Sequence, residues 1–344
     1  MRAGASEGGR RGIACCGNWI VDHVKTITFW PREETLTNIV AEENGTGGSA
    51  YNVLVDLARF DLGIPLSGLG VVGDDADGRS ILADLDDRGI DRERVKALEG
   101  VSTSYTDVMT VRETGRRTFF HNRGANALLG PEHLDPAGID ARILNLGYLL
   151  LLDTLDEDDP VYGTKAARVL ARCREAGIAT SIDVVSEDTD RFARIVTPAL
   201  PHADYCIVNE IEAGRTVGRA LRRGDGLDRA VTEAAAADLL ARGVKRLVVI
   251  HAAEGSFGLS ADGASAWQPS HLLPPGYIRG TVGAGDAFMA GMLAGLHEGW
   301  GLERSLRFAT AAAATCLRHP TTTAGVGNAE EIWRVAETVP VRGS

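Results

Sequence analysis

The sequence predicts an α/β protein built on a doubly wound, mostly parallel β-sheet, and two observations support this. From residue 142 onward, short apolar runs alternate with segments of helical period, which implies parallel strands joined by crossover helices. Glycine-rich turns at 47–48 and 280–285 each precede a segment with apolar residues at helical spacing. Such a turn at a helix start presents unpaired backbone N–H groups and is a natural anion site.

The composition is that of an ordinary globular protein and limits the partners that the chain can have. It has 344 residues, of which 44% are hydrophobic and 24% charged, so one large or two moderate domains are possible. A net charge of -11 argues against nonspecific binding of nucleic acid, which requires a basic face. No uninterrupted apolar run is long enough to span a bilayer, so we expect no membrane partner.

The amino terminus and the cysteines indicate a cytoplasmic protein. Residues 1–12 are rich in Gly and Arg and contain no apolar segment, which predicts a disordered tail and not a signal peptide. The five cysteines show no C-x-x-C spacing and are odd in number. We therefore expect reduced thiols, without a disulfide framework or a zinc site.

In the first half of the chain, a small β-sheet is expected beside the main one. The apolar run 13–17 predicts a buried strand that opens the main sheet, and Ser49 is a plausible cap of a helix. Segment 27–40 alternates irregularly, as in exposed strands, and 104–120 resembles a hairpin. We therefore predict one α/β domain over 13–340 that carries a β-sheet lid formed by about 19–40 and 104–120.

The run G-L-G-V-V-G at 68–73 matches the dinucleotide-binding fingerprint by letter only. A true fingerprint has its strand before the first Gly and begins its helix within the motif. Here the apolar residues lie inside the motif, and a D-D-A-D-G turn follows it. We interpret the run as a strand and a turn, with a helix starting near Asp77.

In the second half, the alternation is regular and places polar residues where strands end. Strands are expected at 143–152, 178–184, 204–209 and 246–251, and helices at 161–176, 227–242, 302–317 and 329–339. In doubly wound sheets, ligands bind at the carboxyl ends of the strands. Asp183, Asn209 and His251 all lie at such ends.

The stretch G-T-V-G-A-G-D-A-F at 280–288 carries the clearest chemical signal in the sequence. Gly283 and Gly285 form a turn that can hold an anion, and Asp286 follows in the first helical turn. A carboxylate beside an anion is useful if it accepts a proton during phosphoryl transfer. The alternative is an ordinary helix start, because an Asp in the first turn is favoured by the helix dipole alone.

Four motifs follow one another along the chain: G-G-S-A-Y-N-V-L-V-D-L-A-R-F with G-L-G-V-V-G-D-D-A-D-G, R-G-A-N at 123–126, N-E-I-E at 209–212, and T-V-G-A-G-D-A-F. In this order they resemble the motifs of the ribokinase-like carbohydrate kinases, often called the PfkB family, and the resemblance extends from about residue 13 onward. The resemblance implies a ribokinase-like fold and a kinase that uses ATP and Mg²⁺.

The resemblance also implies a role for each matching residue. Asp286 matches the catalytic base, and Gly283, Ala284 and Gly285 match the anion hole. Asn209 and Glu212 match the pair that organises Mg²⁺. Without the resemblance, their spacing predicts only a helix cap followed by a carboxylate in the first turn. The implied nucleotide-binding residues are Asn209, His251, Ala253, Gly255, Thr281 and Gly283. The implied substrate-binding residues are Asn18, Asp22, Gly47, Gly48, Asn52, Arg123 and Asn126.

Two departures from the family pattern affect the expected ligands. Gly280 stands where the family usually has an Asp that helps to bind a monovalent cation, so a potassium requirement is in doubt. His251 and Ala252 replace a glycine-containing strand end near the nucleotide.

The sequence therefore predicts an ATP-dependent kinase that phosphorylates a primary hydroxyl of a small sugar, with Asp286 as general base. One alternative is a nucleoside kinase, since Trp19, Phe29, Trp30 and Phe120 could stack on a base. The other is a sugar-binding protein without catalysis, which only Gly280 and Ala252 favour. The exposed aromatics of the lid also predict a homodimer in which a partner covers them.

Overall fold

The structure, a computed structural model, describes residues 9–187, 189–224 and 226–343. Residues 1–8 of the predicted tail lie outside this part of the chain. The first strand of the main sheet begins at Ile13, where the sequence predicts it.

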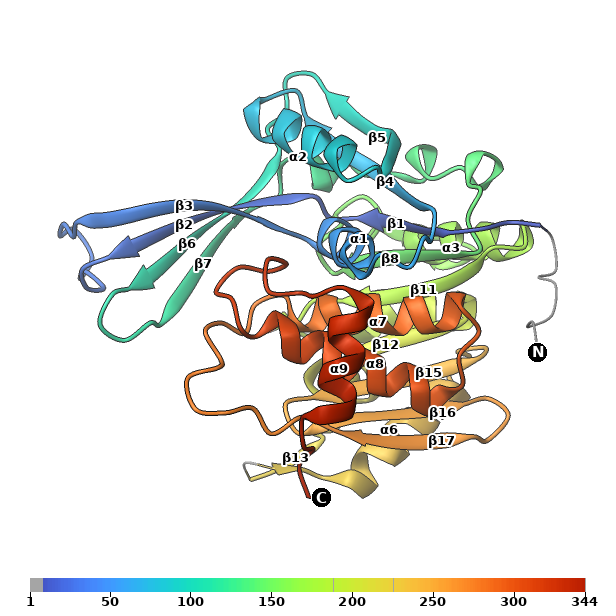
Figure 1. The fold of residues 1–344 in the computed structure, drawn as a ribbon. Helices are drawn as coiled ribbons and strands as arrows, with labels where there is room; N and C mark the ends of the chain where they lie inside the picture. Colours follow the sequence, from blue (N-terminus) through green and yellow to red (C-terminus); the bar gives the residue numbers. More distant parts are fainter. Residues whose placement is uncertain (1–8, 188, 225, 344) are drawn as a thin grey trace.

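The main sheet has nine strands in the order β17-β16-β15-β12-β11-β8-β1-β4-β5. The strands from β15 to β5 are all parallel, and β16 and β17 add an antiparallel edge. This is the predicted doubly wound, mostly parallel sheet (Figure 1). The strands are β1 (Ile13–Gly17), β4 (Leu66–Gly73), β5 (Asp91–Leu98), β8 (Ile143–Leu149), β11 (Ala179–Val184), β12 (Tyr205–Asn209), β15 (Leu247–Ala252), β16 (Gly255–Ser260) and β17 (Ser265–Pro269).

Helices cover both faces of this sheet, and each face has its own hydrophobic core. Successive strand residues alternate between the two cores, as a pleated strand requires: Val248 and Ile250 join one, and Val249 joins the other. One face is packed by α3 (Lys165–Glu175), α4 (Phe192–Ala199), α5 (Glu210–Val217) and α6 (Arg229–Ala241). The other is packed by α1 (Ser49–Phe60), α2 (Ala76–Asp87), α7 (Ala284–His297), α8 (Leu302–Cys316) and α9 (Ala329–Thr338).

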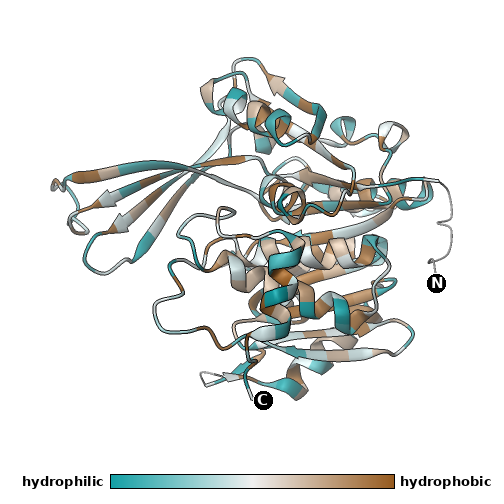
Figure 2. Ribbon diagram, in the orientation of Figure 1, coloured by the Kyte–Doolittle hydropathy of each residue, from teal (hydrophilic) through white to brown (hydrophobic). Residues whose placement is uncertain are grey.

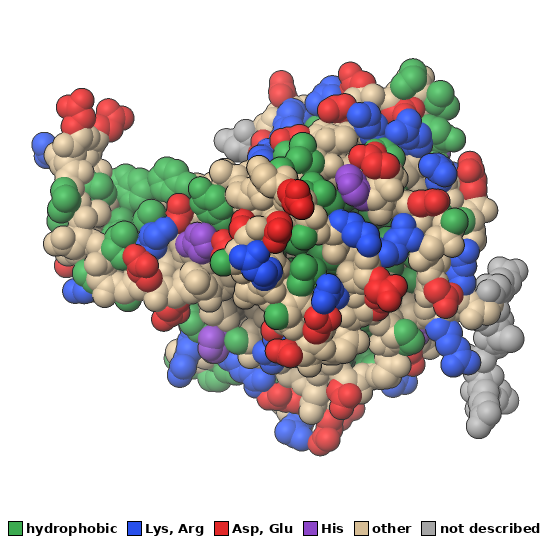
Figure 3. Space-filling model, turned by 90° about the horizontal axis from the view of Figure 1, so that it is seen from above, with side chains coloured by type: hydrophobic (Ala, Val, Ile, Leu, Met, Phe, Trp, Pro, Cys, Tyr) green, Lys and Arg blue, Asp and Glu red, His purple; other side chains and the backbone are tan. Residues whose placement is uncertain are grey.

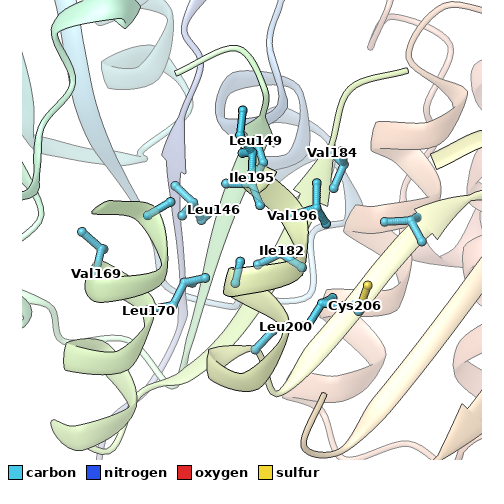
Figure 4. Close-up of a cluster of buried hydrophobic side chains, with 14 of the residues drawn as sticks. Leu146, Leu149, Val169, Leu170, Ile182, Val184, Ile195, Val196, Leu200 and Cys206 are labelled. Carbon is cyan, nitrogen blue, oxygen red and sulfur yellow. The ribbon is translucent and has the colours of Figure 1, made fainter. Parts of the chain in front are cut away.

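Apolar side chains fill the space between the sheet and the first group of helices. Figure 4 shows Leu146 and Ile182 of neighbouring strands beside Leu170 of α3 and Val196 of α4. The sheet strands are correspondingly hydrophobic along much of their length in Figure 2. Because both faces are covered, the polar ends of the strands are the parts of the sheet left to bind ligands.

A second sheet of four strands extends away from the body as an arm (Figure 1). Its order is β3-β2-β6-β7, with β2 and β6 parallel and the other two pairs antiparallel. We call these strands and the loops between them the small sheet. The strands are β2 (Ile20–Ile27), β3 (Ile39–Gly47), β6 (Ser104–Val111) and β7 (Arg117–Asn122). Two short pairs complete the strands: β9 (Asp158–Asp159) with β10 (Gly163–Thr164), and β13 (Arg222–Arg223) with β14 (Gly226–Leu227).

The main differences from the sequence prediction are local. The small sheet includes β3 up to Gly47, beyond the predicted limit, because the polar run at 42–44 gives no strand signal. Helix α3 begins at Lys165, later than predicted, because the Thr164 hydroxyl caps it by accepting a hydrogen bond from the Ala167 N–H. The prediction also omits β5, β16, β17 and α4.

The run at 68–73 is confirmed as a strand, and its glycines make room for a tryptophan. A Cβ on Gly68 would lie 2.7 Å from Trp19, and one on Gly70 would lie 2.1 Å from it. The Trp19 indole is fully buried and donates a hydrogen bond to the Leu69 carbonyl at 3.1 Å. Trp19 is therefore a packing residue, and the idea that it could stack on a base is wrong.

Candidate active site

Polar side chains from several parallel strands meet at the carboxyl edge of the main sheet. Asn18 follows β1, Tyr148 lies near the end of β8, Asp183 near the end of β11, and Asn209 ends β12. This is the edge at which doubly wound sheets bind their ligands. The first turn of α7 brings Asp286 to the same place.

Asp286 is the centre of a buried hydrogen-bond network. One carboxylate oxygen, Oδ1, accepts a hydrogen bond from the Tyr148 hydroxyl at 2.6 Å. The other, Oδ2, accepts one from the Asn52 amide at 2.8 Å. The side chain is 6% exposed, so these two donors fix the orientation of the carboxylate.

The environment of Asp286 raises its pKa to about 6. Burial is the largest cause, and the nearby charge of Asp22 acts in the same direction. The hydrogen bonds from Tyr148 and Asn52 oppose the shift because they stabilise the ionised form. A carboxylate with this pKa is ionised at neutral pH and still accepts a proton readily, as a general base must.

The turn before α7 has the geometry expected of an anion hole. Gly283 has a φ of 83°, and a Cβ there would lie 2.1 Å from the Thr322 carbonyl oxygen. Only glycine fits this position, both for its conformation and for its close approach to the neighbouring loop. The first N–H groups of α7 therefore remain free to face a ligand beside Asp286.

Asp22 and the glycine turn before α1 form the other side of the site. Burial raises the pKa of Asp22, while a hydrogen bond from Thr106 lowers it. A Cβ on Gly47 would lie 2.9 Å from the Asp22 carboxylate, and one on Gly48 would lie 2.4 Å from the Asn18 carbonyl. The two glycines thus let the chain pass directly over two predicted substrate-binding residues.

The other predicted substrate-binding residues mainly hold the backbone around the site. Asn18 accepts a hydrogen bond from the Tyr148 N–H at 2.5 Å. Asn126 is fully buried and pairs its amide with the N–H and carbonyl of Trp19, both at 3.2 Å. Arg123 donates to the Leu150 carbonyl at 3.0 Å and lies 3.3 Å from Asp153. These contacts position Asn18 and the end of β8.

Sequence reasoning did not select Tyr148, although the structure places its hydroxyl against Asp286. The only sequence signal is a tyrosine near the end of a predicted strand. Its partner in space is 138 residues away along the chain, so no local pattern could identify the contact.

An apolar cavity of about 430 Å³ lies next to the start of α7. Most of the predicted nucleotide-binding residues line it: His251, Ala253, Gly255 and Thr281. Burial lowers the pKa of His251 to about 4, so its ring is neutral, and it packs against Phe288 at 4.7 Å between ring centroids. The volume is within the range of cavities that enclose small ligands.

Asn209 and Glu212 form a capping box at the start of α5. The Asn209 side chain accepts hydrogen bonds from the Ile211 and Glu212 N–H groups, both at 2.9 Å. The Glu212 carboxylate accepts from the Asn209 N–H at 2.9 Å and from Ser186 at 2.8 Å. Burial raises the Glu212 pKa to about 7. The helix cap that the spacing predicts is therefore confirmed, and Asn209 does not line the apolar cavity.

Two further observations concern cations. Within 9–187, 189–224 and 226–343, no group of three or more His, Cys, Asp or Glu side chains could hold a metal ion. A Cβ on Gly280 would lie 2.8 Å from the Pro320 Cα and 2.9 Å from the His319 carbonyl oxygen. The backbone packs too closely there for an acidic side chain.

All five cysteines are buried and unpaired, in agreement with the expected free thiols. No helix in the described part of the chain has both the length and the apolar character needed to cross a membrane.

Comparisons with known proteins place these features in a family. The model of the pfkB family carbohydrate kinases matches residues 11–328. The ribokinase of Arabidopsis thaliana is 27% identical over 308 residues, which are 89% of this chain and 76% of that protein. The ATP-dependent ribose-1-phosphate kinase of Halopiger xanaduensis is 28% identical over 302 residues, which are 86% of this chain and 88% of that protein.

Solved structures have the same fold. The structure of Arabidopsis thaliana ribokinase complexed with ribose and ATP has a TM-score of 0.78 at 22% identity, and the match covers 95% of this chain and 99% of that one. The nucleoside kinase of Methanocaldococcus jannaschii has a TM-score of 0.75 at 18% identity, covering 96% and 99%. The chain belongs to the pfkB family of carbohydrate kinases.

Proposed function

We propose that this protein transfers the γ-phosphoryl group of ATP to a primary hydroxyl of a small carbohydrate. The observation that carries the proposal is the place of Asp286. Its helix start, at Ala284 and Gly285, lines the apolar cavity of about 430 Å³, the Gly283 turn lies at its side, and Asp22 is near enough to raise its pKa. One buried base is thereby in reach of a phosphoryl donor on one side and a sugar hydroxyl on the other.

In this mechanism Asp286 accepts the proton of the attacking hydroxyl during an in-line transfer. The Tyr148 and Asn52 donors orient its carboxylate and keep it ionised before the reaction. The N–H groups of residues 283–285 stabilise the charge that develops on the transferred phosphoryl group. No covalent enzyme intermediate is required.

Asp22 is suited to recognise the sugar. A carboxylate can accept hydrogen bonds from two adjacent hydroxyls, and this one lies close enough to raise the pKa of Asp286. Asn18 and the glycines at 47–48 shape the same pocket.

Mg²⁺ would enter with the nucleotide, and Asn209 and Glu212 fit an indirect role toward it. Their oxygens already accept hydrogen bonds in the capping box, and Mg²⁺ usually keeps several waters and binds substrate phosphates. We expect the pair to orient those waters from the start of α5. When bound, the metal would neutralise charge on the phosphates.

The small sheet is proposed to act as a lid that a second subunit also covers. Seven large apolar side chains of this sheet are exposed: Phe29, Trp30, Leu36, Ile39, Val40, Phe119 and Phe120. Figure 3 shows apolar side chains gathered along the arm. Asp22 lies on β2 of this sheet and shares a cavity of about 50 Å³ with Phe119 of β7 and with Thr322, so the sheet itself forms part of the proposed sugar pocket.

A nucleoside substrate is the second candidate, and one observation favours it. Trp30 and Phe120 lie parallel, with their ring centroids 6.1 Å apart and 5° between their planes, on the exposed small sheet. Such a flat aromatic pair offers a face on which a base can stack. A thermal-shift screen of sugars and nucleosides, with and without a nonhydrolysable ATP analogue, distinguishes the two substrate classes.

The test of the mechanism is Asp286→Asn. We expect the variant to bind ATP and the acceptor but to lose about two to four orders of magnitude in kcat, the scale of a lost general base. Asp74→Asn, at an exposed carboxylate paired with Arg79, is the matched control and should behave as the native enzyme does. Retention of more than about a tenth of the native kcat would remove Asp286 from the mechanism.

A further inference from the structure

A second polar cavity lies at the amino edge of the main sheet, opposite the candidate active site. Its volume is about 560 Å³, and its lining includes Arg10, Arg142, Arg174, Asp204, Tyr205 and Arg246. Arg142, Tyr205 and Arg246 each lie at the first residue of a strand or directly before one. We call this space the arginine cavity. The residues around Asp286 lie at the other ends of the same strands, several residues away at about 3.3 Å per residue.

The charges in the arginine cavity are unbalanced. It has four guanidinium groups and one carboxylate, Asp204, in a protein whose net charge is -11. Asp204 lies 3.2 Å from Arg174 and 3.2 Å from Arg246, so one negative charge serves two positive ones. Arg142 donates to the carbonyl of His297 at 2.7 Å, which is a neutral group.

Arg10 has the least satisfied side chain of the four. Its Nη1 atom is buried and has no hydrogen-bond partner among the residues that the structure describes. A buried donor without a partner is costly, and in a cavity of this size an anion could supply the missing acceptor. The concentration of cationic donors therefore calls for a ligand with several negatively charged oxygens.

We propose that the arginine cavity binds the phosphate group of a small phosphorylated molecule. Guanidinium groups present pairs of N–H donors that match phosphate oxygens, and four of them around one space favour a dianion. The volume of about 560 Å³ accommodates a sugar phosphate or a mononucleotide. The net charge of -11 disfavours a nucleic-acid strand as the ligand, so the site is assigned to a small molecule.

This site is separate from phosphoryl transfer and does not depend on the proposed reaction. It would let a phosphorylated metabolite bind to the protein from the edge of the sheet that the substrates do not use. Because the two edges share β8, β11 and β12, an occupied arginine cavity contacts the strands that carry Tyr148, Asp183 and Asn209.

The test is direct binding to the full-length protein by isothermal titration calorimetry. The probes are inorganic phosphate, glycerol 3-phosphate and AMP, and the variant is the double substitution Arg10→Ala with Arg246→Ala. Arg246 is 61% exposed, and Asp204 keeps Arg174 and the Thr180 N–H as partners, so the fold should persist. The double substitution Arg79→Ala with Arg334→Ala, also at exposed and paired arginines, is the matched control.

We expect the native protein and the control to bind at least one phosphate ester, and the Arg10/Arg246 variant to bind it about tenfold or more weakly. Equal binding of inorganic phosphate and the esters would support a site for the phosphate group alone; tighter binding of one ester would identify the class of ligand. Unchanged affinity in the variant, or no binding to the native protein, would overturn the proposal. If the double variant does not fold, Arg246→Glu is tested alone. Weaker binding by this variant supports the proposal, and unchanged binding overturns it.

Discussion

Removal of the Tyr148 hydroxyl is expected to change the pH at which the enzyme works. In Tyr148→Phe the ring remains in place, and Asp286 loses the hydrogen bond of 2.6 Å to its Oδ1 atom. That bond stabilises the ionised carboxylate, so its loss raises the Asp286 pKa from about 6. A hydrogen bond to a charged group contributes about 1.5–3 kcal/mol, and 1.36 kcal/mol corresponds to one pKa unit, so the expected shift is about 1–2 units.

The sign of this effect decides where activity is lost. A general base must be ionised, so kcat/KM falls as the pH drops below the pKa of Asp286. With the pKa raised by about 1–2 units, the ionised fraction at pH 6.5 decreases by about 3- to 25-fold, while above about pH 9 it is nearly unchanged. Tyr148→Phe should therefore be impaired mainly on the acid side of its pH profile.

The assay is kcat/KM from pH 5.5 to 9, followed by coupled detection of ADP. Tyr51→Phe is the matched control, because the Tyr51 hydroxyl bonds to Asp84, away from Asp286. Its acid limb should coincide with that of the native enzyme. An unshifted acid limb in Tyr148→Phe, or an equal loss at every pH, would show that Tyr148 does not tune the base.

Three further outcomes follow from the same structure. Asp56 is fully buried, and its carboxylate has no hydrogen-bond partner in the described part of the chain. Burial raises its pKa, so the folded state keeps a proton that the unfolded state releases near pH 3.8. The free energy of unfolding therefore falls as the pH rises from 3.8 toward the raised pKa of Asp56. Asp56→Asn should weaken the pH dependence of the unfolding free energy and raise that free energy at pH 8 by about 1–3 kcal/mol, measured by urea unfolding. An unchanged pH dependence in the variant would refute this expectation. Because Gly280 has no ligating side chain, turnover should respond little to potassium chloride titrated into a buffer of a bulky organic cation, and a several-fold rise would contradict this. If the small sheet is shared between subunits, light scattering at micromolar concentration should give a dimer, and Phe119→Ser should weaken it relative to Val161→Ser, at another exposed apolar residue.

The parts of the fold that local sequence determines could be predicted. The alternation of strands and helices follows from apolar periodicity, and the Asn209 cap follows from its spacing to Glu212. Asp286 could be selected because its glycine turn and its carboxylate lie together in the sequence.

The contacts that join distant segments could not be predicted. Trp19 appears as a possible stacking residue in the sequence, and only the glycines of β4 show that it is buried. The arginine cavity combines residues from positions 10 to 246, none of which forms a basic run with the others. Side-chain function in these cases depends on tertiary neighbours that no local pattern encodes.

The connections of the small sheet suggest how substrate binding reaches the base. Strand β3 ends at Gly47, and α1, which carries Asn52, begins two residues later. The Thr322 hydroxyl donates to the Thr46 carbonyl of β3 at 2.7 Å, and the Thr322 backbone packs directly against Gly283 of the anion hole. Strand β3 is therefore attached both to the helix that carries the Asn52 donor on Asp286 and to the loop that packs against Gly283. We infer that closure of the small sheet over a sugar aligns the base and the anion hole together, because both are attached to the same strand.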